Sequence, residues 1–311
     1  MTSPATAADF VSSVKHPADF DYFWDDILAR TAAISLDADA VFDPLRSTPQ
    51  VDVYAVHYTS LDHVRIAGWY ARPADPPSAG KLPGLLIVPG YTMEPQIPKN
   101  WAARGYAAFS VAPRGKLRSN SQFNPGYPGL LTHGIIDRNT YAYRGFYMDA
   151  CRGVDFLLSR DEVDGARLGV TGHSQGGGLA IVVPALRPEV TVATSGAPYL
   201  CGFMDAIDLT DGYPYYEIND YLRLYPESRQ QVTDTLAYFD GINLAPRVTC
   251  PIIVNIGQQD STCPPETGYA LFRAIGSEDK RLYDYDGHGH DANNAVHAGI
   301  IDSFLAQHLQ P

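Results

Sequence analysis

The sequence predicts an α/β fold in which a mostly parallel central sheet is covered by helices on both faces. From Leu82 onward, apolar runs such as "PGLLIVPGY", "ARLGVTG" and "CPIIVNIGQQD" alternate with segments of helical spacing such as "MDACRGVDFLLSR" and "AVHAGIIDSFLAQHL". Strands that are apolar throughout are typical of parallel sheets buried on both faces. The 311 residues are 45% hydrophobic and contain no internal repeat or low-complexity linker, so we expect a single domain over residues 1–311.

The residues before Leu82 predict an N-terminal helix and an antiparallel edge to the sheet. In "DFDYFWDDILARTAAI" the large apolar residues, from Phe20 to Leu28, recur at helical spacing. This segment is therefore predicted to be an amphipathic helix packed on the body of the protein. The β-rich runs "VDVYAVHYTS" and "VRIAGWYARP", separated by "LDH", are predicted to form an antiparallel pair of edge strands.

Two segments interrupt the alternation of strands and helices. The first is the turn-rich "GKLRSNSQFNPGYPGLLTHGIIDRNTYAY", and the second is the tyrosine-rich and mostly helical "YPYYEINDYLRLYPESRQQVTDTLAYF". Insertions over the carboxyl edge of an α/β sheet usually build the substrate pocket. For the small helical insertion that includes residues 213–225, a pocket wall and a surface contact are equal alternatives.

Composition argues against several classes of partner and compartment. The formal charge is −12, the pI is about 5.1, and no basic block occurs, so we expect no nucleic acid and no anionic membrane as a partner. The first twenty residues lack the pattern of a secretory leader, and the apolar runs are shorter than a membrane span. The four cysteines, Cys151, Cys201, Cys250 and Cys263, form no C-x-x-C pair and are expected to be reduced core thiols of a cytoplasmic protein.

The stretch "VTGHSQGGG", residues 170–178, predicts a nucleophilic serine at a sharp turn. A plausible strand, "ARLGV", precedes Ser174, and a plausible helix, "GGGLAIVVPAL", follows it, as in the nucleophile elbow of α/β-hydrolases. Such a turn needs small residues two positions before and after the serine, and Gly172 and Gly176 meet this need. The alternative is an ordinary glycine-rich turn.

A serine hydroxyl needs a base and an orienting carboxylate, which in the α/β-hydrolase fold follow it in the order acid, histidine. Asp260 comes directly after a buried strand and is preferred as the acid over Asp284 and Asp286, which lie within or beside the strand that delivers the histidine. Both His288 and His290 follow that strand. His290 is preferred because it directly precedes the polar start of the last helix, although local sequence leaves His288 open.

Two backbone amides are predicted to stabilise the oxyanion. One is the amide of Gln175, directly after the serine at the start of a helix. The other is the amide of Tyr91, in the loop after the strand "PGLLIVPGY". The alternative for Tyr91 is an aromatic side chain that packs in a plain turn.

Several motifs together resemble the acetyl xylan esterase and cephalosporin C deacetylase family of carbohydrate esterases. They include "PGY", "RGK", "GHSQGGG", "GQQDSTCPPET" and "HGHD", and the similarity runs from "FDYFWDDIL" to the last helix. The resemblance implies the α/β-hydrolase fold, hydrolysis of small acyl esters, a nucleophile at Ser174, an acid at Asp260 and a base at His290. It also implies oxyanion donors at Tyr91 and Gln175, and a homo-oligomer, specifically a hexamer whose catalytic centres face an inner cavity.

The sequence departs from the family pattern near the predicted site. Lys116 stands where the family carries glutamine, Asp291 where it carries glutamate, and Pro89 where relatives tend to carry histidine. The segment "TMEPQIP" replaces a glycine-rich continuation. We expect Lys116 to rearrange the floor of the pocket, and these changes open the alternative of a small ester other than an acetylated sugar.

The sequence therefore predicts a serine carboxylesterase that needs no cofactor and no metal and acts on a small acylated substrate through an acyl-enzyme. One alternative is a metal-dependent hydrolase, because "HGHDANNAVH" gathers His288, His290, Asp291 and His297. The other is a catalytically inactive binding protein of the same fold.

Overall fold

The computed structural model describes residues 7–75 and 80–311. The nine strands within these residues belong to one sheet with the order β1-β2-β3-β5-β4-β6-β7-β8-β9. The strands β1, β2 and β3 are antiparallel to their neighbours, β3 is also antiparallel to β5, and all pairings from β5 to β9 are parallel. The strands are β1 (Asp39–Phe42), β2 (Val51–Thr59), β3 (Arg65–Pro73), β4 (Leu82–Val88), β5 (Ala107–Ala112), β6 (Val163–His173), β7 (Val192–Gly196), β8 (Ile252–Gly257) and β9 (Lys280–Tyr285).

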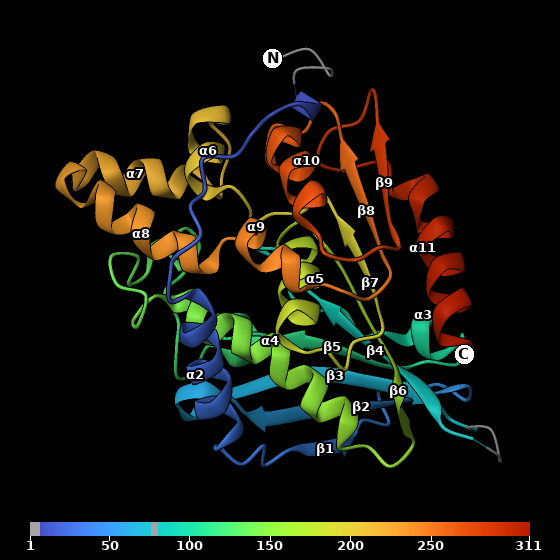
Figure 1. Ribbon diagram of the computed structural model, residues 1–311. Coiled ribbons are helices and arrows are strands. Elements are labelled where there is room, and N and C mark those ends of the chain that lie inside the picture. Colours follow the sequence, from blue (N-terminus) through green and yellow to red (C-terminus); the bar gives the residue numbers. More distant parts are fainter. Residues whose placement is uncertain (1–6, 76–79) are drawn as a thin grey trace.

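Helices cover both faces of the sheet, as the sequence predicts (Figure 1). The helices α4 and α5 pack on one face, whereas α3 and α11 pack on the other. The α-helices are α2 (Phe20–Ala32), α3 (Lys99–Ala102), α4 (Ala142–Leu158), α5 (Gln175–Leu186), α6 (Phe203–Leu209), α7 (Tyr216–Leu224), α8 (Arg229–Phe239), α9 (Gly241–Leu244), α10 (Pro265–Ala274) and α11 (Asn294–Leu309). Short 3₁₀ turns occur at η1 (Leu61–His63), η2 (Leu117–Ser119), η3 (Leu130–Thr132), η4 (Pro226–Ser228) and η5 (Ala245–Arg247).

The core follows from the alternation of side chains along the strands. In β4, Leu82 and Leu86 pack in the large cluster beneath α4 and α5, whereas Leu85 packs with Phe304 and Leu305 of α11 on the other face. Because both faces are covered, both sets of side chains are apolar, and the strand is a continuous hydrophobic run.

The N-terminal predictions are confirmed, with one addition. The helix α2 buries Phe20, Phe23, Trp24 and Ile27, and β2 and β3 form the predicted antiparallel pair. The edge strand β1 was not predicted, because three of its four residues are exposed and lack an alternating apolar pattern. Among the described residues, no helix is both long and apolar enough to cross a membrane.

Candidate active site

Ser174 lies at a strained turn between β6 and α5. Its φ of 61° and ψ of −120° are in a region that non-glycine residues rarely occupy. A Cβ on Gly172 would stand 2.4 Å from the carbonyl oxygen of Gly176, and one on Gly176 would stand 2.3 Å from that of Val88. The two glycines are therefore required because the turn brings backbone against backbone, as the sequence predicts.

His290 connects the hydroxyl of Ser174 to the carboxylate of Asp260. Its Nε2 lies 2.9 Å from Ser174 Oγ, and its Nδ1 lies 2.8 Å from Asp260 Oδ2. Since a carboxylate only accepts hydrogen bonds, Nδ1 carries the proton, and Nε2 is left to accept from the serine hydroxyl. The three residues come from the loops after β6, β8 and β9, so the parallel sheet brings distant parts of the chain to one edge.

Asp260 is buried and held by the turn that follows it. Its Oδ1 accepts hydrogen bonds from the backbone N–H groups of Thr262 at 2.8 Å and Cys263 at 2.9 Å, and the residue is only 6% exposed. The two loops also contact each other directly, because Gln259 N–H donates to the carbonyl of His288. This contact leaves Asp260 Oδ2 directed at the imidazole.

The competing acids and the competing histidine have other partners. Asp284 accepts a hydrogen bond from Tyr269, and Asp286 accepts one from Gln259. His288 Nδ1 is 2.8 Å from Asp291 Oδ2, so the residue that departs from the family pattern orders the loop around the histidines. Of the pair that local sequence left open, His290 is the one that contacts both Ser174 and Asp260, which supports the preference for it.

The alternative metal site comprises His288, His290, Asp291 and His297, and within the described residues their ligand atoms do not come together. His297 is fully buried in α11, where its Nδ1 pairs with the hydroxyl of Tyr285, and burial lowers its pKa to about 4. Within the described ranges, a different group has ligand atoms within 4.8 Å of one another, namely Asp260, Cys263 and His290. A metal held there would displace the hydrogen bond between His290 and Asp260, so it would compete with the arrangement around Ser174.

Tyr91 and Gln175, the predicted oxyanion donors, lie on either side of the elbow. Gln175 is the first residue of α5, where backbone N–H groups lack an intrahelical acceptor, and its side chain donates to the Tyr143 hydroxyl at 2.7 Å. The side chain of Tyr91 is buried and donates to Glu217 Oε1 at 2.5 Å. Tyr91 thus packs as an aromatic residue, and this packing fixes the loop that carries its amide.

Lys116 lies beneath that loop, and the rearranged pocket floor that we expect from it stays a prediction. Its buried ammonium donates to the carbonyl of Gly90 at 2.7 Å and also to the carbonyl of Tyr91. Burial lowers the pKa of Lys116 to about 7, although the nearby carboxylate of Glu94 opposes the shift. The lysine therefore supports the predicted oxyanion loop from below.

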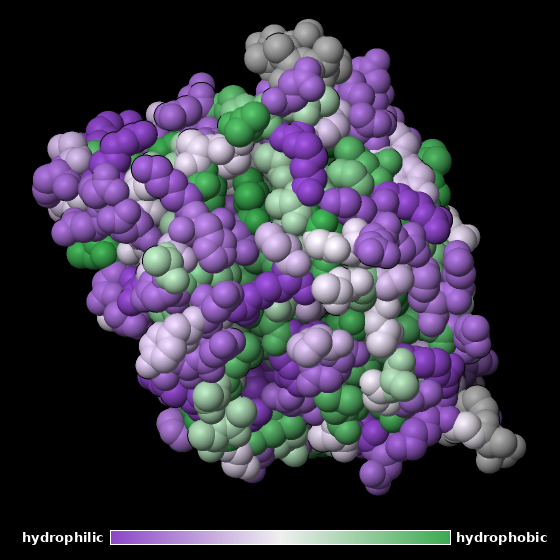
Figure 2. Space-filling model, viewed as in Figure 1, coloured by the Kyte–Doolittle hydropathy of each residue, from purple (hydrophilic) through white to green (hydrophobic). Residues whose placement is uncertain are grey.

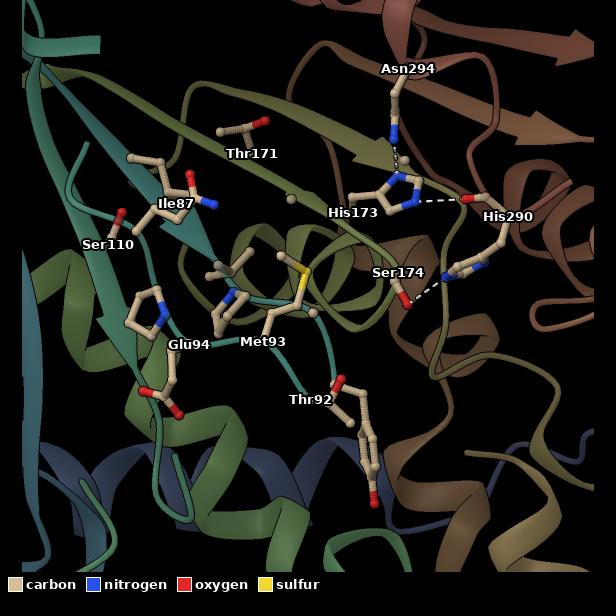
Figure 3. Close-up of a pocket in the computed structure, with 18 of the residues that line it drawn as sticks. Ile87, Thr92, Met93, Glu94, Ser110, Thr171, His173, Ser174, His290 and Asn294 are labelled. Carbon is tan, nitrogen blue, oxygen red and sulfur yellow. Dashed lines mark hydrogen bonds between the residues drawn. The ribbon is translucent and has the colours of Figure 1, made fainter. Parts of the chain in front are cut away.

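His173 is a residue of the site that sequence reasoning missed. Its Nε2 donates to the carbonyl of His290 at 2.8 Å, while Asn294 Nδ2 lies 3.4 Å from its Nδ1 (Figure 3). Burial, and then the proximity of His290, lower the pKa of His173, which favours the neutral ring that this pattern requires. The sequence offered one signal for this role, namely the position of His173 at the end of β6, directly before Ser174.

A cavity of about 800 Å³ opens beside Ser174. One part lies toward the two insertions and is bounded by Tyr127, Tyr213, Pro214 and Glu217. The other part lies over the sheet, under the loop 89–98 and beside α11 (Figure 3). The cavity is lined mainly by apolar side chains, with the serine and the imidazole at its wall.

Part of the tyrosine-rich insertion forms a wall of the cavity, whereas its role as a surface contact stays a prediction. Tyr213 and Pro214 line the cavity, whereas Leu224 and Tyr225 at the end of α7 are exposed. Around these apolar residues the visible surface of α7 and α8 is mostly hydrophilic (Figure 2). All four cysteines are unpaired, with Cys263 buried beside Asp260.

A model of the acetyl xylan esterase family matches residues 7–308. Acetyl esterase Axe7A of Xylanibacter ruminicola is 30% identical over 281 residues, which are 84% of this chain and 61% of that protein. The uncharacterized peptidase YuxL of Bacillus subtilis is 27% identical over 277 residues, which are 82% of this chain and 39% of that protein. The chain spans less than two thirds of the length of either curated relative.

Two solved structures are similar over nearly their whole length. The acetyl xylan esterase from Paenibacillus sp. R4 has a TM-score of 0.92 and 33% identity, with 99% of this chain and 100% of that chain covered. Acetyl xylan esterase 1 from Thermoanaerobacterium sp. JW/SL YS485 has a TM-score of 0.89 and 25% identity, with 98% of both chains covered. On these matches and the geometry around Ser174, the chain belongs to the acetyl xylan esterase family, a family of carboxylic ester hydrolases with the α/β-hydrolase fold.

Proposed function

We propose that this protein hydrolyses small acyl esters, acetyl esters of sugars among them, through an acyl-enzyme formed on Ser174. The observation that carries the proposal is the hydrogen-bonded series from Ser174 Oγ through His290 to the buried Asp260. Membership in the acetyl xylan esterase family supports the acyl group and the sugar.

In the proposed reaction, His290 Nε2 removes the proton of Ser174 as the hydroxyl attacks the acyl carbonyl. Asp260 keeps the proton on Nδ1 and stabilises the imidazolium that forms. The backbone amides of Tyr91 and Gln175 hold the oxyanion, and each such donor is worth roughly 3 kcal/mol of transition-state stabilisation. Protonated His290 then protonates the leaving alcohol, and a water molecule, activated by the same imidazole, releases the acid.

Replacing Ser174 with alanine tests the proposal. We expect hydrolysis of p-nitrophenyl acetate and of acetylated xylo-oligosaccharides by the unchanged protein, and a loss of kcat of at least about 10³-fold in Ser174→Ala. A fluorophosphonate probe should label the unchanged protein at residue 174 and leave the variant unlabelled.

The matched control is Ser303→Ala, which removes a hydroxyl that bonds only a carbonyl within α11. Retention of ester hydrolysis in Ser174→Ala, or sensitivity to a chelator without sensitivity to the probe, would favour the metal-dependent alternative. A folded protein that neither turns over nor takes the label would favour the inactive binding protein.

We also propose a cephalosporin C acetyl group as a further substrate and a homo-oligomer, both implied by the family resemblance. The unpaired thiols support a cytoplasmic location. A single domain over residues 1–311 is supported by the single sheet that contains all nine strands.

A further inference from the structure

An isoleucine on a central strand is partly exposed where a sheet of this kind is normally covered. Ile87 belongs to β4, the fifth of nine strands, and it is the one residue of that strand that is not fully buried. The strand register places Ser110 of β5 and Thr171 of β6 in the same row. All three residues line the cavity that opens at Ser174.

The exposure of this row arises from the connection after β4. In place of a long helix, the chain from Pro89 to Pro98 is a loop, and the helix α3 that follows has only four residues. The space between this loop and α11 is bounded by Ile97, Trp101 and Ile301. The hollow lined by Ile87, Ile97, Trp101, Ser110, Thr171 and Ile301, here called the sheet arm, is continuous with the site.

We propose that the sheet arm binds the acyl chain of the ester, so that the protein hydrolyses esters of medium-chain acids of about six carbons as well as acetyl esters. This inference rests on the proposed function, because it states where the acyl chain of the same ester binds. Cavities of several hundred Å³ that are lined mainly by apolar groups are typical of small-molecule sites, and an acetyl group fills only a small part of such a volume.

The position of His290 indicates that the acyl group, and not the alcohol, enters the sheet arm. The imidazole must protonate the leaving oxygen, so the alcohol lies on the His290 side of Ser174. Figure 3 shows His290 on one side of Ser174, and Met93, Ile87 and Ser110 on the other. The substituent of the acyl carbon is therefore the part of the ester that points toward the sheet arm.

The depth of the sheet arm predicts the length of the acyl chain that it binds. Thr171, which pairs with Ile87, precedes Ser174 by three residues of an extended strand, a distance of about 10 Å at 3.3 Å per residue. Bonds of about 1.5 Å at angles of about 111° advance an extended chain by about 1.25 Å each, so the six bonds from Ser174 Oγ to the last carbon of a hexanoyl group span about 7.5 Å, and its methyl group occupies about 2 Å more. We therefore expect an optimum near hexanoate.

Some polar groups near the arm are already engaged, whereas Glu94 Oε2, within the described residues, is buried without a hydrogen-bond partner. Thr171 accepts a hydrogen bond from Thr194 at 2.7 Å, and Glu94 Oε1 accepts one from the N–H of Leu117 at 2.6 Å. The ammonium of Lys116 is held by the carbonyls of Gly90 and Tyr91. An apolar acyl chain can therefore be buried in the arm without displacing these hydrogen bonds. Each buried methylene is expected to raise kcat/KM by up to about four-fold.

The test is a series of p-nitrophenyl esters from acetate through butyrate and hexanoate to octanoate. The leaving group stays constant, so only the acyl pocket is varied. We expect kcat/KM to rise from acetate to hexanoate and to fall at octanoate. A steady fall from acetate onward would overturn the inference while leaving the proposed function intact, whereas no hydrolysis of any ester would remove the proposed function itself.

Two variants that fill the sheet arm test whether the acyl chain binds there. Ile301→Trp and Ile97→Trp add bulk from opposite walls of the arm, and each is expected to lower the hexanoate-to-acetate ratio of kcat/KM by at least about ten-fold, the value of roughly two buried methylenes. The matched control is Ile300→Trp, a half-buried neighbour on α11 that lies outside the cavity lining and should leave the ratio unchanged.

Circular dichroism and thermal unfolding check that each variant folds, and the two walls provide independent variants should one fail. Unchanged ratios in a folded variant would overturn the inference. A shift in selectivity among acetate esters of different alcohols, without a shift among acyl chains, would assign the arm to the alcohol and overturn it as well.

Discussion

The imidazole of His290 contacts two side chains that differ in burial, those of Asp260 and Ser174. Asp260 is buried and anchored by two backbone N–H groups, so it offers a fixed acceptor to His290 Nδ1. The serine, in contrast, lines the cavity, and its backbone is fixed by hydrogen bonds from its N–H to the carbonyl of Gly196 and from the N–H groups of Gly178 and Tyr199 to its carbonyl. The acid therefore sets the tautomer, and the turn sets the position of the nucleophile.

Asp260→Asn is expected to lower kcat for p-nitrophenyl acetate by roughly 10³- to 10⁴-fold, because an amide N–H facing Nδ1 favours the tautomer whose Nε2 cannot accept the serine proton. Steady-state kinetics measure the change. Asp286→Asn is the control, since Asp286 contacts Gln259 in the neighbouring loop. A kcat in Asp260→Asn within ten-fold of the unchanged protein would contradict the role of Asp260.

Lys116 is a buried cation with a lowered pKa, which links folding to pH. Its pKa of about 7 in the folded chain lies below the ordinary value of 10.5, so between these values the unfolded chain binds more protons. Stability that is present above pH 10.5 is therefore lost as the pH falls toward 7.

Lys116→Gln removes this titration and keeps a hydrogen-bond donor near the carbonyls of Gly90 and Tyr91. We expect the free energy of unfolding of the unchanged protein to rise relative to the variant by up to about 1.4 kcal/mol per pH unit above pH 7. Urea unfolding at pH 7, 8 and 9 measures the difference. Parallel pH dependences of the two proteins would show that Lys116 stays charged.

Two elements meet closely at the turn from β6 into α5. The start of α5 lies against the end of β4, so the helix approaches the strand through Gly176 rather than through a side chain. The same approach brings the Gln175 amide beside the loop of Tyr91. Gly172 is therefore required by the turn itself, and Gly176 by the packing of α5 against β4.

Gly176→Ala places a Cβ 2.3 Å from a backbone oxygen of β4 that cannot easily move. We expect a loss of about 1–3 kcal/mol or more in the free energy of unfolding, together with reduced esterase activity. Gly299→Ala is the matched control, since a Cβ there meets nothing within 4 Å, and alanine in a helix is expected to add about 0.5–1 kcal/mol. Equal stabilities of the two variants would contradict the packing argument.

At the scale of the whole molecule, a buried ion pair joins the antiparallel edge to the helical layer. Arg114, after β5, pairs with Asp149 of α4 through two side-chain bonds of 2.8 and 2.9 Å and also donates to the carbonyl of Leu61. Both charged residues are almost completely buried. The pair therefore holds together three regions that are far apart in the sequence.

Asp149→Ala leaves the Arg114 guanidinium buried without its counterion, and we expect a loss of about 3–5 kcal/mol in the free energy of unfolding. Denaturant unfolding provides the measurement. Asp302→Ala is the control, because its pair with Arg104 is 39% and 49% exposed and should contribute at most about 1 kcal/mol. Similar losses in both variants would show that burial does not determine the strength of the pair.

The sequence predicts the parallel sheet from continuous apolar runs, and the N-terminal helix and the β2–β3 pair from the spacing of their own apolar residues. It misses β1, whose exposed residues have no such pattern. The positions of Ser174 and Asp260 are predictable because each comes directly after a buried strand, and parallel strands bring their carboxyl ends to one edge. The choice of His290, by contrast, depends on where Asp291 binds His288.

By itself, the sequence determined the fold class and the elbow at Ser174, because these depend on patterns of residues close together in the chain. The tertiary structure alone decided the bond from His173 to His290, the support of the oxyanion loop by Lys116 and the sheet arm. Each of these depends on side chains from separate elements meeting in space, and strand register and loop path set such distances where no local pattern records them.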